Sequence, residues 1–153
     1  MQKDKHEFTV DGYGSGETDF LVRLSQDGIM QQLVIDTIID PIVAVLASGD
    51  DGAVLTVAGH SDRVDTAGLS HIDRLAQEAD ASLKRAQSAI EGIHTMVQQR
   101  SPGAPSDLDT LPFFFVFRRF AGAAVLINDA AALSDAERRQ NRRVQIRLVV
   151  FTP

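Results

Sequence analysis

Polar residues that could bind a ligand follow a short apolar run in the first half of the chain. The run 54–58 is β-branched and aliphatic, which is typical of a buried strand, and Gly59 permits a turn directly after it. Asp62 then comes just beyond the carboxyl end of this predicted strand, where open α/β sheets tend to bind ligands. Asp62 is therefore a candidate binding carboxylate. The more general interpretation is that Ser61 and Asp62 cap the turn or the next helix.

A metal site is a second interpretation of the same segment. His60, Asp62 and His71 are ligand types that catalytic zinc sites use in threes. The chain contains no His-Glu-x-x-His, and no pattern brings His71 back to His60. A Ser-His-Asp triad has still less support, because the nucleophile elbow Gly-x-Ser-x-Gly is absent here. We predict no metal, no cofactor and no enzymatic activity, and keep a metal-dependent hydrolase as a third hypothesis only.

Length and composition predict one ordinary globular domain over residues 1–153. The formal net charge of −6 argues against nucleic acid as a partner, and the absence of cysteine excludes disulfides and thiolate metal sites. No run of about 18 apolar residues suggests a membrane span. The charged start 1–7 is not followed by an apolar stretch, so we predict no signal peptide. The protein is then either cytoplasmic or a fragment of an exported chain.

Hydrophobic spacing predicts the elements around this segment. A strand begins at Phe8, and the glycines of 12–16 predict a flexible turn, because a phosphate-binding loop requires further fixed spacings. Apolar residues at helical spacing over 30–46 predict a helix that Pro41 kinks or divides. The succession of strand, helix and strand predicts that the first strand and 54–58 form a parallel pair.

The second half of the chain continues with a long helical pattern over 69–97. It exceeds most globular helices, so we predict a break near 80–82, with Ser82 capping a second segment. The aromatic run 111–117 predicts a strand. Its four phenylalanines could form a binding stripe, but at strand spacing we predict that they are core. We assign no structure to 119–133, and interpret the basic run 138–143 as a solvated approach to a last strand over 144–149.

Three separated motifs resemble one family. The segment 57–62, Val-Ala-Gly-His-Ser-Asp, is similar to Val-x-Gly-His-Thr-Asp of the OmpA-like domain, a peptidoglycan-associating module. The segments 82–90 and 141–146 are similar to its Leu-Ser-x-x-Arg-Ala-x-x-Val helix and its Asn-Arg-Arg-Val-Glu-Ile strand. The resemblance covers about 8–151. It implies an α+β fold, a βαβα-ββ sandwich with a mixed four-stranded sheet and helices packed on it.

The resemblance also implies a function in the bacterial cell envelope. Asp62 and Arg85 match the residues that hold diaminopimelate in the peptidoglycan peptide stem: the carboxylate would accept from the ligand ammonium, and the guanidinium fork would bind the ligand carboxylate. The supporting positions are His60, Ser61, Ser82, Asn141 and Arg142. The chain would be a non-enzymatic cell wall anchoring module of the periplasm or outer membrane. Its partners would be the peptide stem and other envelope or assembly proteins.

The segment 63–81 departs most from the family pattern. It is about two helical turns longer than expected and lacks the loop asparagine, and Gly68 is only an approximate match for the loop glycine. The expected Gly-x-Gly-…-Pro stretch is incomplete within 119–133. These departures support an alternative, in which an OmpA-like structural or assembly domain with a degenerate wall-binding site acts through protein–protein contacts.

Overall fold

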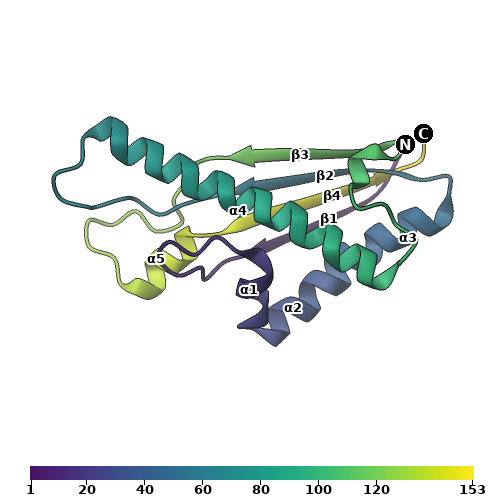
Figure 1. Ribbon diagram of the computed structural model, residues 1–153, viewed down its shortest axis with the longest axis horizontal. Coiled ribbons are helices and arrows are strands. Elements are labelled where there is room, and N and C mark those ends of the chain that lie inside the picture. Colours follow the sequence, from purple (N-terminus) through teal and green to yellow (C-terminus); the bar gives the residue numbers. More distant parts are fainter.

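Four strands form a mixed sheet in the computed structural model, which describes all 153 residues (Figure 1). The strands are β1 (Gln2–Val10), β2 (Gly52–Gly59), β3 (Phe114–Phe120) and β4 (Val144–Phe151), in the spatial order β1-β4-β2-β3. β2 and β3 are parallel, and β4 is antiparallel to both of its neighbours. The fold is therefore α+β with a mixed four-stranded sheet, as the resemblance implied.

The strand alternation predicted for the end of the chain is present in β4. Ile146 and Leu148 point into the core, whereas Gln145 and Arg147 are exposed on the other face. The predicted parallel pairing of the first strand with β2 is wrong, because β4 lies between β1 and β2 and pairs with both. β1 also begins at Gln2, six residues before the predicted start, and its early residues pair with the end of β4.

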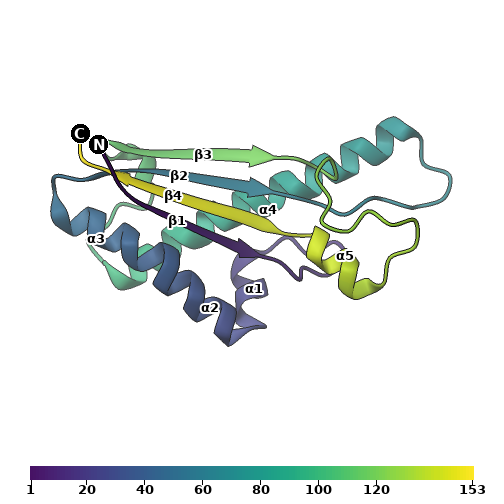
Figure 2. The ribbon, with the colours of Figure 1, turned by 180° about the vertical axis from the view of Figure 1, so that it is seen from behind.

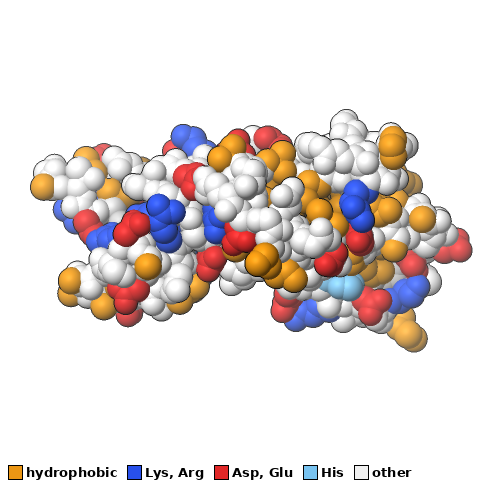
Figure 3. Space-filling view, turned by 90° about the horizontal axis from the view of Figure 1, so that it is seen from below, with side chains coloured by type: hydrophobic (Ala, Val, Ile, Leu, Met, Phe, Trp, Pro, Cys, Tyr) orange, Lys and Arg blue, Asp and Glu red, His pale blue; other side chains and the backbone are white.

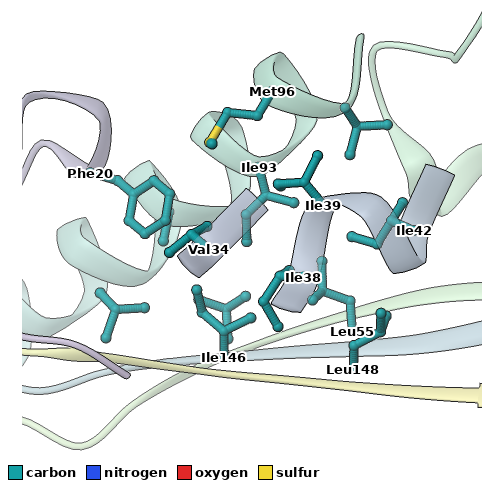
Figure 4. Packing of buried hydrophobic residues seen from close by; sticks show 14 of the residues in the cluster. Phe20, Val34, Ile38, Ile39, Ile42, Leu55, Ile93, Met96, Ile146 and Leu148 are labelled. Atoms are coloured by element: carbon teal, nitrogen blue, oxygen red, sulfur yellow. The ribbon is translucent and has the colours of Figure 1, made fainter. Parts of the chain in front are cut away.

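Helices cover one face of the sheet and leave the other without a helix (Figures 1 and 2). These are α1 (Phe20–Ser25), α2 (Gly28–Val34), a π-helical segment (Ile35–Ile39), α3 (Asp40–Ser48), α4 (His71–Arg100) and α5 (Asp135–Asn141), with a 3-10 turn at Leu108–Thr110. Figure 4 shows the core between the layers, where Ile38 and Ile93 from the helices meet Leu55 and Ile146 from the sheet.

The helix around Pro41 does not divide, and a π-helical segment lies just before the proline. α2, the π-helical segment and α3 follow one another without a gap, and Pro41 is in the first turn of α3. Because proline has no N–H to donate, the chain widens to π-helical spacing in the turn before it. By length and composition, Gly28–Ser48 is apolar enough to cross a membrane. In this fold its Val34, Ile38 and Ile42 pack in the core, as a core helix would.

α4 is one continuous helix of 30 residues, so the predicted break near 80–82 is wrong. Ser70 caps its start, since its hydroxyl accepts from the Asp73 N–H at 3.1 Å. Ser82 instead donates to the Ala79 carbonyl within the helix. The C-terminal part of α4 lies along the sheet, and its first turns extend beyond the ends of the strands (Figure 1).

The aromatic run is a strand, but the prediction that it is core is wrong for most of its side chains. Phe114 is buried, whereas Phe113, Phe115 and Phe117 are each about half exposed. β3 is an edge strand, and the helices cover only one face of the sheet, so its outward residues lack a covering layer. Phe113 also has a positive φ of 61°, which is uncommon for a bulky residue and marks a tight entry into β3.

Candidate functional site

A cleft of about 530 Å³ opens at the end of the sheet where β2 stops, a volume within the range of small-ligand sites. Its walls come from the glycine-rich segment after β1, the loop after β2, the first half of α4, and α5. Both of the predicted ligand-binding residues, Asp62 and Arg85, line it. Acidic and basic side chains lie next to one another at this end of the molecule (Figure 3).

The close approach of α4 to the end of β2 brings these two residues to one place. A Cβ atom on Gly59 would lie 1.8 Å from the Ser82 carbonyl oxygen, so only glycine allows the helix backbone this near. Asp62 comes three residues after Gly59, and Arg85 comes one helical turn after Ser82. The motif glycine thus sets the geometry of the cleft as well as the turn.

Asp62 is almost fully buried and has three protein partners. Its Oδ2 accepts from Arg138 Nη1 at 2.8 Å, and its Oδ1 accepts from Asn141 Nδ2 at 2.9 Å. The guanidinium of Arg142 lies 3.6 Å from Oδ2. Two arginines therefore already surround this carboxylate, and its charge is compensated within the protein.

Arg85 is in the opposite situation. It is 2% exposed, and it donates from Nε to the Glu17 carbonyl at 3.0 Å and from Nη1 to the His60 carbonyl at 2.9 Å. Neither acceptor carries a formal charge, and no carboxylate lies within ion-pair distance of the guanidinium. Its group also stacks over the Tyr13 ring at 5.3 Å. Arg85 is therefore a buried cation without an anionic partner.

The electrostatics of Arg85 agree with this description. Burial lowers the pKa of its guanidinium to about 10, and the positive charge of Arg142 adds to this change. Tyr13 and the more distant charges of Glu17 and Asp62 oppose it, and they do not outweigh burial. Arg85 stays charged at neutral pH, at a cost that a bound anion would offset. Burial also raises the pKa of the Tyr13 hydroxyl, so the ring supports Arg85 as a neutral phenol.

Two further polar atoms at the cleft have no hydrogen-bond partner in the protein. They are the Ser61 hydroxyl and Nη1 of Arg142, both buried atoms of residues that line the cleft. Buried donors of this kind are costly unless a ligand or water satisfies them. Together with Arg85, they make a set of donors that suits a carboxylate.

The other predicted supporting residues build the walls rather than line the cleft. The His60 ring pairs with the Gln145 amide at 2.8 Å, and only its backbone carbonyl reaches Arg85. The Ser82 hydroxyl accepts from the Gly122 N–H at 3.0 Å and so joins α4 to the loop after β3. Asn141 accepts from two N–H groups, those of Ile127 and Asn128, and orders that loop against Asp62.

The long segment 63–81 lines the cleft without filling it. Its helical part extends α4 past the sheet, and Gln77, Glu78 and Ala81 contribute one wall. Glu78 is nearly buried, and its carboxylate accepts from the Val64 N–H at 3.0 Å. This bond fastens the loop after Asp62 to the added helical turns.

The metal hypothesis receives no support from the arrangement. His71 begins α4 at an exposed position, while the His60 ring is engaged with Gln145. The chain has no group of three histidine or acidic side chains placed to hold a metal ion.

Sequence reasoning missed Arg138, and it misinterpreted the basic run around it. Arg139 and Gln140 are exposed, but Arg142 is 9% and Arg143 2% exposed, so the second half of the run 138–143 is buried rather than solvated. The helical spacing of Arg138, Asn141 and Arg142 was a usable signal, since residues three and four apart share one face. Residues 12–16 are also more than a flexible turn, because Tyr13 is fully buried and Gly16 lines the cleft.

Comparisons with known proteins give similarity in structure only. No family model matches the chain, and no curated protein matches its sequence. The periplasmic domain of Helicobacter pylori MotB (residues 97–256) is similar at 13% identity, with 97% of this chain and 86% of that chain covered and a TM-score of 0.47.

Two more solved structures are similar over most of the chain. The cell wall anchor of the T6SS from Pseudomonas aeruginosa has 19% identity and a TM-score of 0.45, and 100% of this chain and 87% of that chain are covered. The OmpA-like domain of FopA1 from Francisella tularensis has 12% identity and a TM-score of 0.44, with 97% and 73% covered. At these values, the ligand of the cleft has to be inferred from the residues that line it.

Proposed function

We propose that the cleft binds the diaminopimelate residue of a peptidoglycan peptide stem, and that the chain is a non-enzymatic module that anchors a protein or assembly to the cell wall. The observation that carries this proposal is Arg85, a buried cation that faces the cleft and has no anionic partner. The three motifs that resemble the OmpA-like domain provide the identity of the ligand. A periplasmic or envelope location follows from the same proposal.

The chemistry of the ligand fits the donors around Arg85. A free diaminopimelate end carries a carboxylate, which the guanidinium fork of Arg85 would bind, with Ser61 and Arg142 supplying further donors. The same end carries an ammonium group, for which Asp62 is the nearby carboxylate. Arg85 and Asp62 thus give each charged group of an amino-acid end a side chain of opposite charge in one cleft.

Sedimentation with purified peptidoglycan tests the proposal. We expect Arg85→Ala to weaken retention by on the order of 2–5 kcal/mol, because the ion pair with the ligand is desolvated. Arg85→Lys is the second variant, since it keeps the charge and loses the fork, and it should weaken retention less. Lys84→Ala is the matched control, because Lys84 is the exposed neighbour in the same helix and pairs with Asp80.

The thermal midpoint of each variant separates binding from folding, because Arg85 also holds the carbonyls of Glu17 and His60. Retention of Arg85→Lys and Arg85→Ala equal to that of the wild type, with all variants folded, would count decisively against this site.

A second candidate function is an OmpA-like assembly domain that acts through protein contacts. The specific observation in its favour is an apolar groove beside the cleft, where Leu75 of the α4 extension faces Phe120 at the end of β3 and Ala123 of the loop that follows. Leu75 and Phe120 are each about half exposed. Loss of partner capture in Leu75→Glu, together with unchanged peptidoglycan retention in Arg85→Ala, would favour this function over wall binding.

A further inference from the structure

Arg138 lies where the ammonium group of a bound amino-acid end would have to bind. One amino group of its guanidinium, Nη1, is 2.8 Å from Asp62 Oδ2, and the other, Nη2, is 2.5 Å from Asp65 Oδ2. Asn141 occupies the second oxygen of Asp62 at 2.9 Å. A ligand ammonium therefore meets a carboxylate that already has both oxygens engaged.

The two sides of the cleft thus differ in what they lack. On the side of Asp62, the negative charge is compensated by Arg138 and approached by Arg142. On the other side, Arg85 has no anion, and the Ser61 hydroxyl has no partner. The groups of the cleft that lack a protein partner therefore suit a carboxylate, and a ligand needs no ammonium group to satisfy them.

We propose that Arg138 determines the specificity of this cleft by competing, from within the protein, with the ammonium group of the ligand. This inference rests on the proposed function. A ligand end that carries only a carboxylate binds to Arg85 and leaves Arg138 in place. The ammonium of a zwitterionic end must displace the Arg138 guanidinium from Asp62. The loss of that ion pair offsets most of the binding energy that the ammonium would add.

Because Asp65 also pairs with Arg138, the exchange requires only the Arg138 side chain to move. The Asp65 carboxylate is 56% exposed, so Arg138 can leave Asp62 and keep one ion pair at the rim of the cleft. The backbone below Arg138 is fixed, because Ser134 and Glu137 form a reciprocal capping box at the start of α5. The cost of the exchange is one charge-assisted hydrogen bond to Asp62, which the ligand ammonium replaces.

Two matched peptides test this inference. One is a stem tripeptide that ends in meso-diaminopimelate, and the other ends in 2-aminopimelate, which keeps the carboxylate and lacks the free ammonium. Isothermal titration of the wild type should give dissociation constants for the two within about three-fold. In Arg138→Gln, the diaminopimelate peptide should bind about ten-fold more tightly, while the aminopimelate peptide changes by less than about three-fold.

Two further variants give the test its controls. Arg139→Gln changes the next arginine of α5, which pairs with Asp135 and does not line the cleft, and it should leave both constants unchanged. Asp65→Asn removes the rim acceptor that holds displaced Arg138. It should weaken the diaminopimelate peptide by about three-fold and leave the aminopimelate peptide as it is.

An unchanged ratio of the two constants in Arg138→Gln overturns the inference, as does equal weakening of both peptides in a variant that keeps its thermal midpoint. Should that variant unfold, the ratio in Asp65→Asn decides, because Asp65 is exposed. If binding is lost in Arg85→Ala but both constants are unchanged in Arg138→Gln, this inference is overturned and the proposed function stands. Binding of neither peptide to any of these proteins overturns the proposed function with it.

Discussion

The two halves of α4 have the same sequence pattern and opposite surroundings. Over the sheet, Ala86, Ile93 and Val97 are completely buried. In the extension beyond the sheet, Ile72 is 76% and Leu75 50% exposed, although both continue the same apolar spacing. Helical periodicity therefore indicates which face of a helix is apolar, and the neighbouring elements decide whether that face is covered.

Buried polar side chains mark the boundary between the halves. Glu78, Ser82 and Arg85 follow one another at helical spacing, and each is at most 9% exposed. Each makes a bond to another segment: to the loop after β2, the loop after β3, and the backbone at His60. Packing of the second half of the helix on the sheet thus places the buried polar side chains of the first half beside the cleft.

The largest effect should come from the half over the sheet. Ile93→Ala removes a fully buried side chain from the core and should lower the free energy of unfolding by about 2–5 kcal/mol. Leu75→Ala is the matched change in the extension and should cost less than about 1 kcal/mol, because Leu75 is half exposed. Urea unfolding measures both. Equal losses would show that the extension is part of the same packed unit.

A smaller effect is expected at the boundary. Glu78→Ala leaves the Val64 N–H without its acceptor and should cost about 1–3 kcal/mol. Hydrogen exchange should show faster exchange of the Val64 amide in this variant. Glu91→Ala is the control, since Glu91 is exposed on the packed half and its carboxylate accepts only from the Gln87 amide within the same helix. A Val64 amide that exchanges at the wild-type rate would contradict the tie between the loop and the extension.

The smallest effect is a dependence of stability on pH. Burial lowers the pKa of His94 below its usual 6.5 and outweighs the opposing charges of Asp107 and Asp109. The unfolded chain therefore takes up the proton first, so stability is full above about pH 6.5 and falls as the pH drops towards the folded-state pKa. His60 contributes in the same direction, through burial and the charge of Arg143.

Denaturation at pH 7.5 and pH 5.5 measures this dependence. His94→Gln should reduce the difference between the two stabilities, and His71→Gln, at the exposed start of α4, should leave it as in the wild type. A wild-type protein that is more stable at the lower pH would contradict the assignment.

Much of the fold could be predicted from local patterns, and its strand order could not. The run 54–58 is the middle of β2, and the alternation 144–149 lies within β4. The insertion of β4 between β1 and β2 depends on pairing between residues over 130 positions apart, such as Phe8 with Ile146. Local periodicity carries no information on such a contact. The rule that two strands joined by a helix pair in parallel holds for β2 and β3 and not for β1 and β2.

Part of the candidate site could likewise be predicted from local motifs, and part could not. Asp62 and Arg85 followed from motif positions, and they line one cleft, while their roles toward a ligand stay predictions. Arg138 was missed because a run of arginines is usually solvated, whereas here α5 turns one face of that run toward Asp62. The phenylalanines of β3 were assigned to the core because their spacing suits a strand, and spacing does not tell an edge strand from a central one.

The two chain ends lie together at the end of the sheet opposite α5 and the first turns of α4, as Figure 1 shows, and the Met1 ammonium donates to the Thr152 carbonyl at 2.8 Å. The cleft is at the α5 end. This arrangement has a mechanical consequence. A force that pulls the start of β1 away from Arg138 of α5, which precedes β4 at the cleft, runs along the strands and loads the hydrogen bonds between β1 and β4 in shear, all at once. A force that separates the two ends instead opens the same bonds one after another. The domain is therefore built to resist traction along its long axis and to yield more readily across it.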